Sequence, residues 1–144
     1  MSLRSGMTVE TMNLRGRGRL PDLFGFRVMA LEQGLLVAEL DIRPELLAPN
    51  GFLHAATIVA LADTACGYGC IAHMPKGAEN FTTVELKSNF LGTAREGVIA
   101  CVAKPAHLGK TTQVWDATVT RHDDGRPIAL FRCTQMILWP KTGG

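Results

Sequence analysis

The sequence has few aromatic and few charged residues. Of its 144 residues, 6% are aromatic and 19% are charged, whereas 47% are hydrophobic. A chain this apolar buries enough surface to fold, so the composition excludes an intrinsically disordered protein. At roughly 100 to 200 residues per domain, the length predicts one globular domain and leaves no room for two. The sequence also contains no internal repeat, low-complexity tract or linker.

An excess of charge of one sign is absent too. The formal net charge is +2 at pH 7, from 15 basic and 13 acidic residues. A dedicated nucleic-acid binder needs a dense basic surface to neutralise phosphates, so we expect no nucleic acid as a partner. One basic run, RGRGR at residues 15–19, is too short to predict a phosphate-binding arm. We expect a polar, partly mobile leader at residues 1–20 and a single domain at residues 21–144.

The sequence lacks a CxxC pair, although it has four cysteines, Cys66, Cys70, Cys101 and Cys133. We expect them to be reduced core residues of a cytoplasmic protein, and the first residues show no apolar segment typical of a secretory signal. Cys66, Cys70 and His73 follow helical spacing. Three ligands without a fourth fall short of a structural zinc site, so we expect no metal and no cofactor.

Only one long hydrophobic run is present, at residues 52–72, and its only ionisable side chains are those of His54, Asp63 and Tyr68. The run has the length of a membrane span. A carboxylate near its centre would be costly in a bilayer, however, and the flanking segments are amphipathic, so we expect no membrane contact. The run instead predicts a long helix enclosed by the rest of the fold, ended by Pro75 and Gly77.

Strand patterns surround this helix. Residues 35–42 alternate in their second half as a half-buried strand does, and four more strands are predicted after the helix, at residues 83–91, 98–103, 111–121 and 128–139. An Asp-Gly pair within residues 122–126 favours a tight hairpin turn. No helix separates these later strands, which implies antiparallel pairing. The predicted fold class is α+β, with an antiparallel sheet wrapped around one long central helix.

Asp63 is anomalous in the middle of the apolar helix. A buried carboxylate is costly unless it is paired, and helical neighbours that could pair with it are not basic, being Val59, Ala60, Cys66 and Gly67. Small neighbours let another segment or a ligand approach, and burial without a cation raises the pKa toward that of a general base. The alternative is a purely structural role, in which Asp63 is hydrogen-bonded to backbone in a loop contact. We favour a functional role.

The start of the helix is a second candidate feature. His54 closely follows Asn50 and Gly51, where free N–H groups and the helix dipole favour negative charge. The amide of Ala55 is the natural donor to a developing oxyanion, because its small side chain leaves the N–H accessible. For His54 itself, a capping or packing role is as compatible with the sequence as a catalytic one.

The spacing of His54 and Asp63 along the helix keeps the two residues apart within one chain. Nine residues at 100° each place His54 and Asp63 on opposite faces of the helix, about 13 Å apart along its axis. If both belong to one active site, that site must be built from two chains. A twofold-symmetric dimer would contain two such sites.

Two runs carry a family signature, NGFLHAA at residues 50–56 and ALADTA at residues 60–65. They resemble the signature of hotdog-fold acyl-CoA thioesterases of the phenylacetate-pathway type, in which the same nine-residue spacing separates the His and the acid. Residues 83–91 resemble the strand that follows the helix in this family, and HLGK at residues 107–110 resembles its loop before the last hairpin. The resemblance covers roughly residues 35–139.

This resemblance implies a homodimer or homotetramer that hydrolyses an aromatic or medium-chain acyl-CoA, with sites at the dimer interface. Asp63 would be the catalytic carboxylate, acting as general base or as nucleophile. Ala55, next to His54, would donate its amide to the thioester carbonyl across the interface. Asn50 would help to bind the carbonyl, and Thr83 would assist the water.

Two departures from the family pattern stand out. The family usually has Gly-Gly after the His, whereas this chain has Ala55 and Ala56, whose methyl groups could narrow the pocket. Asn50 lies four residues before His54, where related sequences often have a longer gap. The alternative functions are a non-catalytic acyl-CoA-binding hotdog module and a hotdog hydratase or dehydratase, whose usual motifs are not visible in the sequence.

Overall fold

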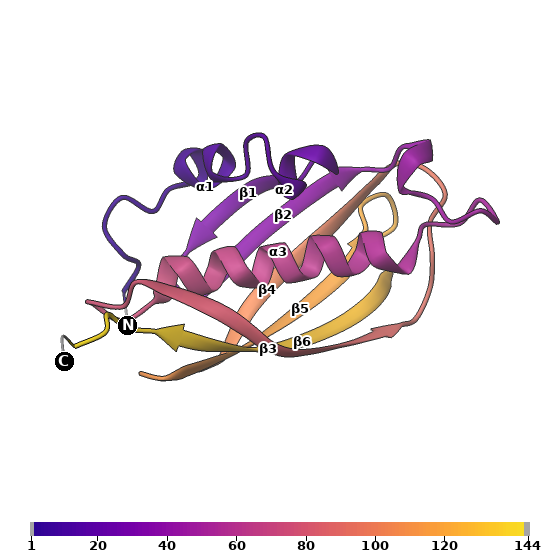
Figure 1. The fold of residues 1–144 in the computed structure, drawn as a ribbon. Coiled ribbons are helices and arrows are strands. Elements are labelled where there is room, and N and C mark those ends of the chain that lie inside the picture. Colours follow the sequence, from indigo (N-terminus) through magenta and orange to yellow (C-terminus); the bar gives the residue numbers. More distant parts are fainter. Residues whose placement is uncertain (1, 143–144) are drawn as a thin grey trace.

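A computed structural model describes residues 2–142, which form one antiparallel sheet around a long helix (Figure 1). The helices are α1 (Val9–Arg15), α2 (Leu20–Leu23) and α3 (Ala55–His73), with a short 3-10 helix at Pro44–Leu46. The strands are β1 (Arg27–Glu32), β2 (Leu35–Asp41), β3 (Asn80–Phe90), β4 (Val98–Leu108), β5 (Thr112–Arg121) and β6 (Pro127–Leu138). Their order in the sheet is β1-β2-β4-β5-β6-β3. The predicted α+β class and hotdog arrangement are confirmed.

Helix α3 packs against the concave face of the sheet. Alternate residues of the strands point toward it and are buried, for example Leu36, Ala38 and Leu40 on β2. The helix is apolar on almost every side because the sheet covers most of its surface, as expected for an enclosed helix. By length and composition α3 could also cross a membrane, but most of it is buried inside the fold.

Two glycines let the sheet approach α3 closely. A Cβ atom at Gly69 would lie 2.6 Å from the ring of Trp115 on β5, and one at Gly67 would lie 3.0 Å from the ring of Phe81 on β3. Both distances are too short for a side chain to fit without a shift of the ring. The Phe81 ring therefore rests directly on Gly67, which fixes the height of β3 along the helix.

The N-terminal segment contains a helix that its polar composition did not predict. Thr8 caps α1 through a reciprocal capping box with Thr11. One side chain of this helix, Met12, is buried and joins the main core. Asn13 holds α1 against β1, since its side chain accepts from the Val28 N–H at 2.7 Å and donates to the Val28 carbonyl at 3.0 Å.

Two strands extend beyond their predicted bounds by three residues or more. β3 begins at Asn80, three residues before the predicted start, and β4 continues to Leu108 although its apolar run ends at residue 103. Pro105 fits within β4 because the pairing with β5 is irregular between Pro105 and His107, where a missing N–H is tolerated. His107 and Leu108 therefore belong to β4 rather than to the loop before the hairpin.

Candidate active site

Asp63 lies in the middle of α3, on the side of the helix that the sheet leaves partly open. Its carboxylate is half-buried, and the Oδ1 atom is fully buried without a hydrogen-bond partner among residues 2–142. Burial raises the pKa of this carboxyl group above its ordinary value. An unpartnered carboxylate of raised pKa is suited to accept a proton, as the sequence predicted.

The open side of the helix is lined by small residues. Ala56 and Ala60 share the helical face of Asp63, at spacings of seven and three residues from it. In Figure 1, α2 lies along one flank of α3 and β3 lies along the other.

Thr83 lies on β3 at the level of Asp63. β3 runs antiparallel to α3 (Figure 1), and Phe81 is seated on Gly67. Two residues of a strand span about 6.7 Å, and four residues of a helix span about 6.0 Å. The distance from Phe81 to Thr83 along β3 therefore matches the distance from Gly67 to Asp63 along α3. Thr83 also shares the helix-facing side of the strand with Phe81. The matching steps put Thr83 at about the height of Asp63 along α3 within one chain.

The first turn of α3 has one free backbone donor. His54 is the N-cap, and its Nδ1 accepts from the Ala56 N–H at 2.9 Å. The amides of Thr57 and Ile58 both donate to the His54 carbonyl. Of the first four amides of the helix, only that of Ala55 makes no hydrogen bond within the described chain, and Ala55 is exposed.

His54 therefore has a structural role that the sequence allowed for. Because Nδ1 accepts a hydrogen bond, the neutral ring carries its proton on Nε2. The ring is exposed, so this Nε2–H is a second donor at the start of the helix. Its neighbour Ala55 supplies the first, and both lie about 13 Å along the helix from Asp63.

Asn50 lies on a separate loop. Its Oδ1 accepts from the Phe52 N–H at 3.2 Å, and Gly51 has a φ of +86°, a conformation that favours glycine. A bridge between Leu47 and Leu53 closes this loop, which projects beyond the end of α3 in Figure 1. Within one chain the loop does not bring Asn50 to Asp63.

Sequence reasoning did not single out Gln135 on β6. Its side chain is fully buried, and its Oε1 accepts from the Thr83 hydroxyl at 2.8 Å. The signal was a polar residue on the apolar face of a strand, between Cys133 and Ile137. Without the pairing of β3 with β6, that signal does not connect Gln135 to Thr83.

The helical face formed by Cys66, Cys70 and His73 is structural. Both ring nitrogens of His73 are used by backbone groups, since Nε2 accepts from the Gly34 N–H and Nδ1 bonds the Gly69 carbonyl, each at 2.8 Å. Burial lowers the pKa of this imidazole. Across residues 2–142, no cluster of three or more His, Cys, Asp or Glu side chains is arranged to hold a metal ion.

Comparison with known proteins gives the family. The model of the thioesterase superfamily matches residues 50–128, more than half of the chain. The chain belongs to this superfamily and is a thioester hydrolase. The predicted membership in the hotdog thioesterases is thereby confirmed.

Individual relatives agree with this assignment. The chain is similar to 1,4-dihydroxy-2-naphthoyl-CoA hydrolase of Escherichia coli, with 30% identity over 92% of this chain and 96% of the relative. The enzyme of the same name in Listeria monocytogenes is 29% identical over 80% of this chain and 92% of its own length. A crystal structure of a mutant of thioesterase PA1618 from Pseudomonas aeruginosa matches with a TM-score of 0.90 at 28% identity, covering 96% of this chain and 99% of that one.

Proposed function

We propose that the protein hydrolyses the thioester of an aromatic or medium-chain acyl-CoA to the free acid and CoA. The observation that carries this proposal is the presence of one free amide, at Ala55, and of one half-buried carboxylate whose Oδ1 atom has no partner, at Asp63. The names of the two hydrolases to which the chain is similar support an aromatic acyl-CoA as substrate. The small residues beside Asp63 leave room for the thioester.

In the proposed mechanism, the thioester carbonyl accepts a hydrogen bond from the Ala55 amide, where the dipole of α3 also favours negative charge. Asp63 of the second copy takes a proton from a water molecule, which Thr83 of that same copy helps to hold. The hydroxide oxygen attacks the carbonyl carbon, and the oxyanion forms at the Ala55 amide. Collapse of the tetrahedral intermediate breaks the carbon–sulfur bond and releases CoA as its thiolate.

A panel of acyl-CoA esters tests this proposal directly. Purified protein is mixed with benzoyl-CoA, 1,4-dihydroxy-2-naphthoyl-CoA, hexanoyl-CoA and crotonyl-CoA, and free thiol is measured. We expect thiol release from the aromatic or the medium-chain esters. Hydration of crotonyl-CoA without thiol release would contradict the proposal. A single turnover in ¹⁸O-labelled water tests for a nucleophilic Asp63. An unlabelled first acid product would show that water attacked the Asp63 carboxyl carbon of an acyl–Asp63 anhydride, whereas a general base that activates water labels the acid.

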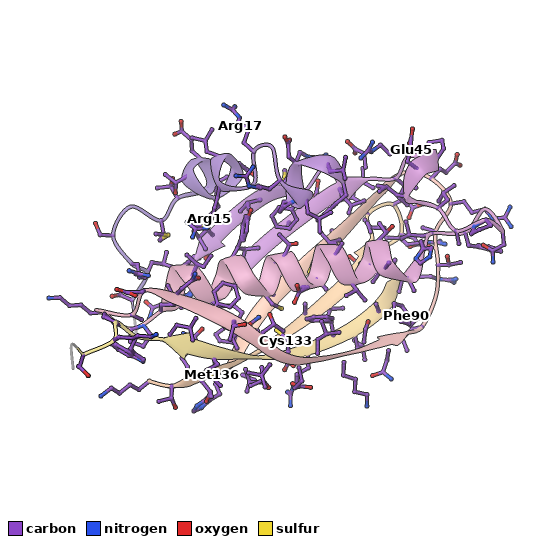
Figure 2. The ribbon with its side chains drawn as sticks, viewed as in Figure 1. Arg15, Arg17, Glu45, Phe90, Cys133 and Met136 are labelled. Atoms are coloured by element: carbon purple, nitrogen blue, oxygen red, sulfur yellow. The ribbon has the colours of Figure 1, made fainter. Side chains whose placement is uncertain are left out.

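The edge of the sheet at β3 supports a site shared between two copies. β3 pairs only with β6, so its other edge is open within the described chain, and most of its residues are exposed. Leu86 and Phe90 are 42% and 47% exposed, with Phe90 near the end of the strand (Figure 2). A long apolar edge strand is an aggregation hazard in a monomer. A second copy paired at β3 would cover it and bring the two helices close together.

We therefore expect a homodimer or a dimer of dimers, without activity as a monomer. Mixed dimers give a sharp test, in which the inactive variants Asp63→Asn and Ala55→Pro are co-expressed. Each mixed dimer contains one intact site, formed by Ala55 of one copy and Asp63 of the other, so about a quarter of wild-type activity should return. Light scattering reports the assembly. An active monomer, or no recovery in verified mixed dimers, would contradict the shared site.

A further inference from the structure

The buried amide of Gln135 links Thr83 to the protein interior. Thr83 and Gln135 are direct partners in the pairing of β3 with β6. The Thr83 hydroxyl donates to Gln135 Oε1 at 2.8 Å, and Gln135 Nε2 donates to Cys133 Sγ at 3.3 Å. Cys133 lies on β6 next to α3 (Figure 2) and hydrogen-bonds Cys66, three residues after Asp63. The chain of contacts therefore begins and ends beside the proposed catalytic groups.

The two thiols lie at the inner end of this chain of contacts. The hydrogen bond with Cys133, together with burial, raises the pKa of the Cys66 thiol well above its ordinary value. Cys133 is likewise fully buried. The sulfur of Cys133 accepts from Gln135 Nε2, and the amide oxygen of Gln135 then faces Thr83. The orientation of the amide is thus set by its environment.

This orientation decides what the Thr83 hydroxyl offers to water. A hydroxyl has one proton and two lone pairs. Since the proton is committed to Gln135 Oε1, Thr83 Oγ1 can only accept on its remaining side. A water between Thr83 and Asp63 then donates one O–H to each of them, and a lone pair of the water stays free to attack. A freely rotating Thr83 hydroxyl could instead donate to the water or to the Asp63 carboxylate, which would weaken the base.

We propose that Gln135 is a positioning residue that holds the Thr83 hydroxyl as an acceptor for the attacking water. This inference rests on the proposed function. Burying an amide is costly, and the sulfur that Gln135 Nε2 contacts is a weak acceptor, so packing alone would favour an apolar residue here. The strong hydrogen bond of Gln135 is the one to Thr83.

Gln113 on β5 provides a matched control. It is also fully buried and lies opposite Gln135 in the pairing of β5 with β6. Its side chain donates to the His73 carbonyl at 3.1 Å and accepts from the Trp115 indole at 2.8 Å, without touching Thr83. Both glutamines thus have similar burial, but only Gln135 hydrogen-bonds Thr83.

The experiment compares Gln135→Met, Gln113→Met, Thr83→Val and the double variant Gln135→Met with Thr83→Val. Kinetics are measured on the acyl-CoA that wild type hydrolyses fastest. We expect Gln135→Met to lower kcat about tenfold with little change in KM, as for loss of one hydrogen bond. Gln113→Met should lower the free energy of unfolding but keep kcat. With Thr83→Val already present, Gln135→Met should cause no further loss, because the two residues act as a unit.

Additive losses in the double variant, or an equal fall in kcat in Gln113→Met, would overturn the proposal. If Gln135→Met does not fold, Gln135→Asn replaces it, since the shorter side chain withdraws the oxygen from Thr83 while it stays polar. Unchanged kcat in folded Gln135→Asn would then overturn the proposal. A wild-type protein that releases no thiol from any ester would refute the proposed function itself, whereas an active wild type with additive losses would refute only the role of Gln135.

Discussion

Replacement of Asp63 by Asn is expected to slow thioester hydrolysis about a hundredfold to ten-thousandfold, the usual cost of removing a general base. The change keeps the size of the side chain but removes the group that takes the proton from water. Thiol release at saturating acyl-CoA measures the effect. Full turnover by a folded, assembled Asp63→Asn protein would show that another group supplies the base.

The same variant should be at least as stable as wild type at neutral pH. Burial raises the pKa of Asp63 above its ordinary value of 3.8. A group with a raised pKa in the folded state contributes stability that is fully present below its unfolded pKa and is lost as pH rises through its folded pKa. At pH 7 wild type therefore bears the cost of burying an ionised carboxylate, and Asp63→Asn does not. Urea denaturation at pH 7 and pH 4 should show the advantage of the Asn variant shrinking at the lower pH.

The pH dependence of activity follows from the same group. The base must be ionised, so activity should fall as pH is lowered through the folded pKa of Asp63. Because this pKa is raised, the acid limb of kcat/KM should have its midpoint above 3.8. A midpoint at or below that value would contradict a buried, unpartnered base.

The main elements of the fold were predictable because their hydrophobic patterns are long. The long apolar run predicted α3, and alternating or short apolar segments predicted β2 and the four strands after the helix. α1 was not predictable in the same way, because only Met12 of its seven residues is buried. Its position depends on Asn13 and the backbone of Val28, a contact between segments that no local pattern encodes.

The candidate site was predictable where a residue conflicted with its own neighbours. Asp63 was such a case, as a carboxylate in an apolar helix without a basic partner nearby. The nine-residue spacing from His54 also predicted a site shared between chains. Thr83 was suggested only by resemblance, because its height relative to Asp63 depends on Phe81 resting on Gly67. Gln135 required the register of β3 against β6, which a single sequence does not contain.

The proposed oxyanion donor is a backbone group, so its test requires proline. Ala55→Pro removes the one amide in the first turn of α3 that makes no hydrogen bond in the described structure, and loss of an oxyanion donor costs about a hundredfold to a thousandfold in kcat. The fold should tolerate the change. Proline is favoured at the first position of a helix, and His54 already has the extended backbone (φ −68°, ψ 137°) that a residue before proline adopts.

Ala55→Gly is the matched control, because it keeps the amide and restores the residue usual in the family. Its activity should stay within a few-fold of wild type, or rise for bulkier acyl groups if the methyl group of Ala55 narrows the pocket. Circular dichroism and light scattering establish that both variants are folded and assembled. If the Pro variant then hydrolyses thioesters as fast as the Gly variant, a group other than the amide of residue 55 polarises the thioester carbonyl. The exposed Nε2–H of His54 would be the next donor to remove, since it lies at the same end of α3.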